Sequence, residues 1–450
     1  MKKKTLHSQL ADYLKTDPLP MHMPGSKRRT GSFSSSDITE INGFDNLHDP
    51  KGILSDLEDE LASLWNAEEA FISVNGATAA IEAAICAAMR YSPDGKILAT
   101  SNCHLSVWHG IEMSGCRHRT VNPVIGDLPF SLEINPQDIG KMLEEDSSIK
   151  TVVITSPTYE GIISDTRSIF EITRKHDCTL IVDEAHGSHL GLDDFWGNGA
   201  VGDIVIKSTH KTLSSPTQTA VMLKFTDRIS TEDIRHYIDI FESTSPSYLL
   251  ISGISEMVEL LEKDGSMDDW KKAVSYAENE LKDLRNIRLF NNRNKDRSKL
   301  VFLCDGNRLS DILRDKYNIE AEAGWETHLI AMTGIGDNEE TIKRFVDAVK
   351  EIDLEHPELR TDDTPAELYE HLFAMSLSEA ARIPQIAVPV AEAEGRICGE
   401  FIYKYPPGVP LLMPGEIVTE KALTSLIQEN RQELLTLISR NPSESDNQQS

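Results

Sequence analysis

The sequence has few basic residues for its acidic content. Lysine and arginine number 45 against 73 aspartates and glutamates, which gives a formal net charge of −28 at pH 7. Such a chain would on average repel a nucleic-acid backbone or an anionic membrane surface, so neither is expected as a partner. The negative field could attract a cationic substrate, but acidity more often serves only to keep a protein soluble.

Paired cysteine motifs and long apolar runs are also missing. The six cysteines form no CxxC pair, and several lie in apolar runs, so reduced and mostly buried thiols are expected at Cys86, Cys103, Cys116, Cys178, Cys304 and Cys398. No run of about 18 apolar residues occurs. The N-terminal MKKKTLHSQLADYLK has the pattern of an amphipathic helix and not the apolar core of a signal peptide. A cytoplasmic protein is therefore expected.

Short apolar runs alternate with longer amphipathic ones from residue 53 to about residue 225. Strand-like KILAT, TVVIT, TLIVD and AVMLKF alternate with helix-like TAAIEAAICAAMR and SIFEITRKH. This rhythm is typical of βα units and predicts an α/β protein with a mostly parallel sheet. A chain of 450 residues is too long for one compact core, so two or three domains are expected.

The rest of the chain predicts two further domains. Apolar residues recur at helical spacing between Pro246 and Leu284, which predicts a long connecting helix into a smaller α/β domain. A charged, proline-containing stretch then suggests a boundary near residue 365, followed by the helical pattern ELYEHLFAMSLSEAAR. The predicted division is an N-terminal arm (1–45), a major domain (46–250), a small α/β domain (251–365), a C-terminal domain (366–440) and a disordered tail (441–450).

An aspartate and a lysine lie at the ends of two apolar strands. TLIVD places Asp183 at the end of one predicted strand, and DIVIKSTHK places Lys211 just past the end of another. In an open α/β sheet such strand ends face the ligand crevice. Pyridoxal phosphate needs a lysine amine for its Schiff base and an acid that keeps its pyridine nitrogen protonated. Either residue alone could be structural, but the pair indicates a pyridoxal-phosphate site.

The phosphate of that cofactor would need backbone N–H groups at the start of a helix. SVNGATAAIEAAI supplies a strand, a glycine turn and a helix start, so Gly76, Ala77 and Thr78 are candidates. The motif alone is equally compatible with a tight turn and an N-cap threonine. His104 follows the apolar run KILAT and could stack on the planar cofactor, although a lone histidine is more often structural.

Three short motifs match other sites but occur in the wrong context. GNGAVG (197–202) fits GxGxxG but precedes a strand, where a dinucleotide site would require it to follow one. STHK (208–211) fits S-x-x-K, but no SDN or KTG element accompanies it. HGSH (186–189) has no third metal ligand nearby. No dinucleotide, β-lactam or metal site is predicted.

Nine segments in order, spanning roughly residues 20 to 420, resemble the bacterial ornithine/lysine/arginine decarboxylase family. They are PMHMPGSKR, SSSDITEINGFDNLHDPKG, NGATAA, NCHLS, SPTYEG, DEAHGSH, KSTHKTL, STSPSYLL and YPPGVPLLMPGE. The resemblance implies an aspartate-aminotransferase-like fold (PLP fold type I). Its mostly parallel sheet domain would be joined by a smaller α/β domain and a C-terminal α+β domain.

The resemblance also implies roles around the cofactor ring. Lys211 would form the Schiff base, Asp183 would pair with the pyridine nitrogen, and His104 would stack on the ring. Ala185 would pack beneath the ring and His186 would lie beside it. For Lys211, Asp183 and His104 these roles agree with those inferred from the residues themselves.

The phosphate and the assembly are assigned in the same way. The resemblance suggests that Ser208 and His210 join Ala77 and Thr78 around the phosphate, with Ala77 offering only its backbone amide. It further implies a homodimer or larger homo-oligomer with the active site at the subunit interface. The segment 243–250 would then reach the neighbour's cofactor.

The sequence departs from the family pattern at three positions. Ser26 stands where the family often has histidine, Leu105 where it often has lysine, and Ala77 where a fuller hydroxyl set is usual. These departures bear on substrate preference and cofactor affinity. Because PMHMPGSKR begins at Pro20, the chain resembles the short members without a receiver-like N-terminal domain.

The predicted reaction is the decarboxylation of a basic amino acid to an amine and carbon dioxide, in polyamine metabolism or acid resistance. Among the possible substrates, arginine is slightly preferred over lysine and ornithine. Selectivity for a cationic side chain would require a carboxylate or an aromatic ring at the far end of the pocket. One alternative is another reaction on the same scaffold, such as aminotransfer or β-elimination. Another is an inactive, cofactor-binding relative, which the substitutions at Ser26 and Leu105 motivate.

Overall fold

The computed structural model describes residues 4–16, 36–361, 365–366, 371–405, 408–428 and 431–438. The predicted disordered tail, the segment PMHMPGSKR and its Ser26 lie outside the described residues. No described helix is both long enough and apolar enough to cross a membrane.

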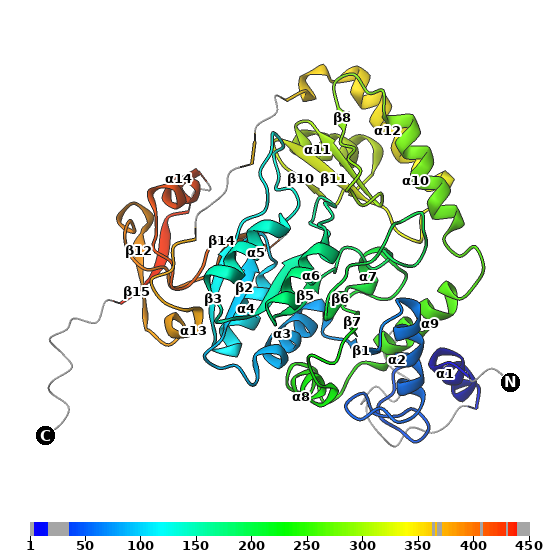
Figure 1. Ribbon diagram of the computed structural model, residues 1–450. Helices are drawn as coiled ribbons and strands as arrows, with labels where there is room; N and C mark the ends of the chain where they lie inside the picture. Colours follow the sequence, from blue (N-terminus) through cyan, green and yellow to red (C-terminus); the bar gives the residue numbers. More distant parts are fainter. Residues whose placement is uncertain are drawn as a thin grey trace, which may run out of the picture.

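A seven-stranded sheet with the order β1-β7-β6-β5-β4-β2-β3 lies at the centre of the molecule (Figure 1). Strands β6, β5, β4, β2 and β3 run parallel, whereas β7 is antiparallel to both of its neighbours. This confirms the predicted mostly parallel sheet. The strands are β1 (Glu69–Ser73), β2 (Lys96–Thr100), β3 (Arg117–Val121), β4 (Ile149–Thr155), β5 (Thr179–Asp183), β6 (Ile204–Lys207) and β7 (Ala220–Lys224).

Helices cover both faces of this sheet because alternate strand residues point to opposite sides. In β4, Val152 and Ile154 belong to one apolar core, while Val153 between them belongs to the other. The first core includes side chains of α1 (Leu6–Lys15), α2 (Ile53–Leu64), α5 (Pro136–Glu145), α6 (Thr166–Lys175) and α9 (Tyr248–Leu261). The second includes α3 (Gly76–Met89), α4 (Leu105–Ser114) and α8 (Thr231–Phe241).

The strand order reverses direction between β2 and β4. From β2 the chain moves outward to β3, then returns to the other side of β2 and continues outward through β4, β5 and β6. In open α/β sheets ligands bind outside the carboxyl ends of the strands at such a reversal. The residues that follow β2, β4, β5 and β6 are therefore placed to form a site.

A second, antiparallel sheet with the order β10-β11-β9-β8 carries its own helices and apolar core. Its strands are β8 (Arg288–Leu289), β9 (Lys299–Leu303), β10 (Ala323–Gly324) and β11 (His328–Met332), and its helices are α10 (Asp268–Leu281), α11 (Gly306–Tyr317) and α12 (Glu339–Glu355), with a 3-10 turn at Pro357–Leu359. The predicted long connecting helix was wrong. Its two halves are α9 and α10, which are separated by a turn in which Gly265 adopts φ +74°.

The C-terminal segment forms two small antiparallel sheets on the side of the main sheet opposite α1 and α2 (Figure 1). Its elements are α13 (Leu377–Ala380), β12 (Gln385–Pro389), a 3-10 turn (Val390–Glu392), β13 (Ile402–Lys404), β14 (Val409–Leu412), α14 (Glu420–Gln428) and β15 (Glu433–Leu437). Among the described residues of ELYEHLFAMSLSEAAR, only α13 is helical, so the predicted helix does not extend through them. Residues 371–376 are not helical, and Phe373 forms a β-bridge with Glu416. The predicted domain boundaries stay predictions.

Candidate active site

A cavity of about 840 Å³ opens at the carboxyl end of the main sheet. Residues that follow β2, β4, β5 and β6 line it, as the reversal of strand order predicts. Residues on either side of β10 and the β14 segment also line it, so the second sheet and the C-terminal segment contribute. All ten residues predicted for the site from the sequence line this one cavity: Gly76, Ala77, Thr78, His104, Asp183, Ala185, His186, Ser208, His210 and Lys211.

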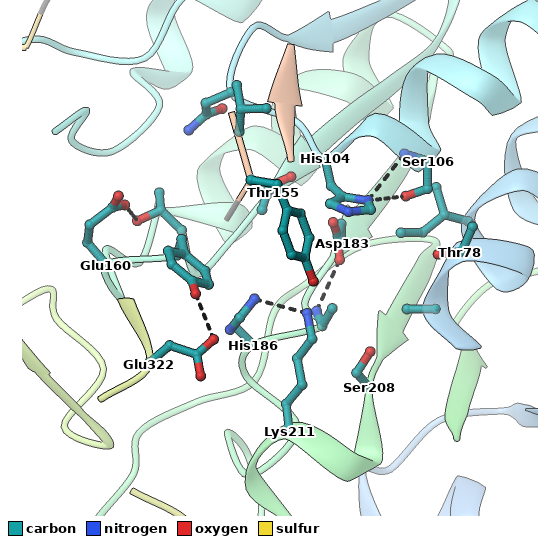
Figure 2. A pocket seen from close by; sticks show the side chains of 18 of the residues that line it. Thr78, His104, Ser106, Thr155, Glu160, Asp183, His186, Ser208, Lys211 and Glu322 are labelled. Atoms are coloured by element: carbon teal, nitrogen blue, oxygen red, sulfur yellow. Dashed lines mark hydrogen bonds between the residues drawn. The ribbon is translucent and has the colours of Figure 1, made fainter. Parts of the chain in front are cut away.

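Lys211 lies in α7 (Thr209–Thr212), a single turn that directly follows β6. Its side chain extends into the cavity, where Nζ lies 2.9 Å from Nε2 of His186 (Figure 2). Burial lowers the pKa of Lys211, and the nearby charges of Asp183 and Glu322 oppose that shift. A lowered pKa makes the neutral amine, which is the nucleophilic form of lysine, easier to reach.

Asp183 is the last residue of β5 and is 3% exposed. One of its oxygens, Oδ1, accepts a 3.1 Å hydrogen bond from the backbone N–H of Ala185. This bond fixes the carboxylate toward the cavity and brings Ala185 to the cavity wall. Asp183 is therefore a buried carboxylate in the same space as the Lys211 amine (Figure 2).

His104 caps the N-terminus of α4, which fixes the orientation of its ring. Nδ1 accepts hydrogen bonds from the Ser106 backbone N–H at 3.2 Å and from its hydroxyl at 2.8 Å. Burial lowers the pKa of His104, so the ring is neutral at pH 7. The neighbouring Leu105 N–H donates to the carbonyl of Gly408 at 2.9 Å, which holds the C-terminal segment against this histidine.

The predicted phosphate residues gather at the N-terminus of α3 and at the end of β6. Gly76 begins α3 with φ +80°, a conformation that favours glycine. His210 donates from Nδ1 to the carbonyl of Thr219 at 2.9 Å, and Ser208 lies beside it on the cavity wall. In Figure 2, Thr78 and Ser208 lie on one side of Lys211, and Glu160 and Glu322 lie on the other.

The sequence did not predict the side chains at the opposite end of the cavity. Glu322, in the loop before β10, accepts a 2.6 Å hydrogen bond from the hydroxyl of Tyr159. Glu160 accepts a hydrogen bond from Thr158, and burial raises the pKa of Glu160. Trp325 also lines this end. The motif SPTYEG contained Tyr159 and Glu160 without indicating a role, and Glu322 lies in a polar stretch typical of an exposed loop.

The two histidines of HGSH have separate partners. His186 faces Lys211, whereas His189 is fully buried, donates from Nε2 to Asp296 at 2.9 Å and has its Nδ1 3.1 Å from the hydroxyl of Thr212. Within the described part of the chain, no cluster of three or more metal-binding side chains is found. The GNGAVG glycines lie in the loop before β6 and not at a helix start.

The cavity fits a polar, phosphorylated cofactor. It contains a buried amine, a buried carboxylate and a helix N-terminus, which are the groups that pyridoxal phosphate requires. Three buried polar atoms that line it have no hydrogen-bond partner among the described residues: Asn102 Oδ1, Thr155 Oγ1 and His328 Nε2. Because an unpaired buried polar atom is costly, these atoms indicate a bound polar group.

Comparison with known proteins gives matches along nearly the whole chain. Residues 30–326 match the family described as Orn/Lys/Arg decarboxylase, major domain, and residues 365–432 match the corresponding C-terminal domain. The chain is 28% identical to the arginine decarboxylase of Bacillus subtilis, over 94% of this chain and 93% of the relative. It is 26% identical to that of Bacillus anthracis, over 93% and 91%.

Solved structures share the fold. The Francisella novicida lysine decarboxylase LdcF superposes with a TM-score of 0.81 at 16% identity, over 96% of this chain and 81% of that chain. A ureidoglycine-glyoxylate aminotransferase from Bacillus subtilis superposes with a TM-score of 0.55 at 18% identity, over 69% of this chain and 87% of that one. The predicted aspartate-aminotransferase-like fold is confirmed.

Proposed function

The chain belongs to the Orn/Lys/Arg decarboxylase family, and from that premise we propose that it decarboxylates arginine with pyridoxal phosphate held by Lys211. The observation that carries this proposal is the convergence of three groups in one cavity. These groups are the Lys211 amine, the Asp183 carboxylate and the N-terminus of α3.

Each of these groups has a distinct task in the proposed reaction. When bound, the cofactor supplies an electron sink for the bond that breaks at the substrate α-carbon. Asp183 would hold a proton on the pyridine nitrogen, His104 would stack on the ring, and the N–H groups of α3 would bind the phosphate. The cavity wall would exclude water from the α-carboxylate. A poorly solvated carboxylate is more readily lost as carbon dioxide.

The far end of the cavity supports a substrate with a planar cation. Glu322 already accepts from Tyr159 through Oε1, so its other oxygen can accept from a guanidinium N–H. Trp325 and Phe130 also line the cavity and offer aromatic surface on which a guanidinium can stack. The relatives at 28% and 26% identity are both named arginine decarboxylases. The smaller ammonium group of a lysine substrate would contact less of this aromatic surface.

A product assay tests the proposal. The purified protein, reconstituted with pyridoxal phosphate, is incubated with each common amino acid, and carbon dioxide, amines and oxo acids are measured. We expect carbon dioxide and agmatine from arginine, and Lys211→Ala should reduce this release at least about 10³-fold because covalent binding of the cofactor is lost. An oxo acid as the main product would indicate aminotransfer, and undiminished release from Lys211→Ala would refute the role of Lys211.

A further inference from the structure

His186 lies between two lysines. Its Nε2 is 2.9 Å from Nζ of Lys211, and its Nδ1 is 2.8 Å from Nζ of Lys299. Lys299 is the first residue of β9 in the second sheet and is 0% exposed. A buried lysine amine from a different part of the chain is thus connected to Lys211 through one imidazole ring.

Hydrogen-bond chemistry restricts the protons that this cluster can hold. A neutral imidazole has one N–H donor and one acceptor nitrogen, whereas an ammonium group can only donate. Around a neutral ring, the lysine that faces the imidazole N–H must accept and is therefore a neutral amine, while the lysine that faces the other ring nitrogen donates. At most one of the two lysines is therefore an ammonium. Burial and the two adjacent lysines hold the pKa of His186 well below its usual range, so the ring is the neutral member.

The surrounding charges favour Lys299 over Lys211 as the lysine that is protonated. Asp296, Glu322 and Glu160 stabilise the charged form of Lys299, while Lys211 destabilises it. Lys211 is stabilised by Asp183 and Glu322. Two other histidines near His186, His104 and His210, disfavour a charge on the ring. The phenol ring of Tyr159 also faces His186.

Two further features suit a buried group that exchanges protons. Burial lowers the pKa of Lys299 to about 8, so this amine can gain and lose a proton near neutral pH. Tyr159 packs edge-on against His186 with ring centroids 5.1 Å apart, and the Lys299 Nζ lies 5.5 Å from the Tyr159 ring. The aromatic ring therefore packs against both His186 and the Lys299 amine.

We propose that Lys299 is a positioning residue that takes a proton from Lys211 through His186 and so leaves the Lys211 amine neutral. The proton on Lys211 Nζ moves to His186 Nε2 as the proton on His186 Nδ1 moves to Lys299 Nζ. No other bond changes, and the reverse transfer restores the starting state. The inference rests on the proposed function, because a neutral amine is what Lys211 needs to bind the cofactor's aldehyde.

The experiment measures the attachment of pyridoxal phosphate to Lys211 in the full-length apoprotein as a function of pH. Attachment is followed by absorbance, trapped with borohydride and assigned to Lys211 by mass spectrometry. For Lys299→Met the midpoint of this profile should rise by about one to two pH units, which is a tenfold or greater loss of rate below the midpoint. Lys299→Gln is a second variant with the same expected shift. Its amide can still donate a hydrogen bond to His186 but cannot take up a proton.

His186→Leu separates a relay from simple repulsion between the two lysines. A relay predicts that His186→Leu shifts the midpoint as Lys299→Met does, and that the double variant shifts it no further. An unchanged midpoint in His186→Leu, or additive shifts in the double variant, would overturn the relay.

Lys295→Met is the matched control, because the Lys295 amine lies in the same segment but bonds to the backbone carbonyls of Asp296 and Lys299 and not to His186. This variant should keep the wild-type midpoint. If the Lys299 variants keep it as well, the inference fails while the proposed function stands. If the wild-type protein does not attach the cofactor at Lys211, the proposed function fails first.

Discussion

Glu322→Gln tests whether a negative charge selects the substrate's cationic end. The substitution removes the charge but keeps the shape, and a glutamine side-chain oxygen can still accept the 2.6 Å hydrogen bond from Tyr159. The geometry of the cavity should therefore survive. Any change in substrate preference can then be attributed to the lost carboxylate.

The size of the effect follows from the type of contact. A hydrogen bond to a charged group contributes about 1.5–3 kcal/mol net, and a factor of ten corresponds to about 1.4 kcal/mol. For arginine, kcat/KM should therefore fall about 10- to 150-fold. Most of the change should appear in KM, because Glu322 lies at the end of the cavity away from the phosphate residues and would hold the substrate equally before and during the reaction (Figure 2).

Citrulline provides the comparison, since its urea group has the shape of a guanidinium without the charge. Its turnover, slow in both proteins, should change by less than about threefold, which is within the range expected for a neutral hydrogen bond. Glu326→Gln is the control variant, because Glu326 is exposed like Glu322 but is not part of the cavity wall. An equal loss for arginine and citrulline, or no loss for arginine, would refute the assignment of Glu322.

Two further substitutions test the support of the site. Asp296→Asn should lower the free energy of unfolding at pH 7 by about 3–5 kcal/mol in urea titrations, because it breaks the buried pair with His189. The pKa of Asp296 is lowered to about 2, so the wild-type advantage is complete above the unfolded value of 3.8 and is lost as the pH falls toward 2; equal stability at pH 7 would contradict this. Gly408→Ala places a Cβ 3.1 Å from the His104 ring at φ +90° and should weaken cofactor binding about 5- to 30-fold in equilibrium titrations (about 1–2 kcal/mol). Gly395→Ala is the control, because Gly395 has a similar φ of +73° but no atom within 4 Å of an added Cβ. Equal cofactor binding by the two variants would show that the contact of Gly408 with His104 does not matter.

The cofactor half of the cavity could be predicted from the sequence because it depends on local order. Asp183, Lys211 and His104 each follow an apolar strand, and parallel strands bring their carboxyl ends to one edge. No distant pairing has to be known for this step. The start of α3 was predicted in the same way, from a strand, a glycine and a helix in succession.

The other half could not be predicted, because it depends on how the second sheet packs on the first. Lys299 begins a strand whose five residues are all buried. It lies 88 residues after Lys211 in the sequence, and nothing in KLVFL indicates that its side chain reaches the site of Lys211. The two wrong helix predictions have a similar origin. Apolar spacing continues across Gly265, although the turn there interrupts the helix, and Phe373 pairs with Glu416 instead of extending a local helix.

The division of the site between two sheets implies where substrate preference can change. Asp183, Lys211 and the start of α3 come from the main sheet and would hold the cofactor, which is the same whatever the amino acid. Glu322 and Trp325 flank the short strand β10 and contact neither the phosphate residues nor Asp183 through any hydrogen bond among the described residues. Substitutions beside β10 can therefore alter the fit of the substrate side chain while leaving the cofactor half intact. Lys299 joins the two halves, because it lies in the second sheet and is connected to Lys211 by hydrogen bonds through His186.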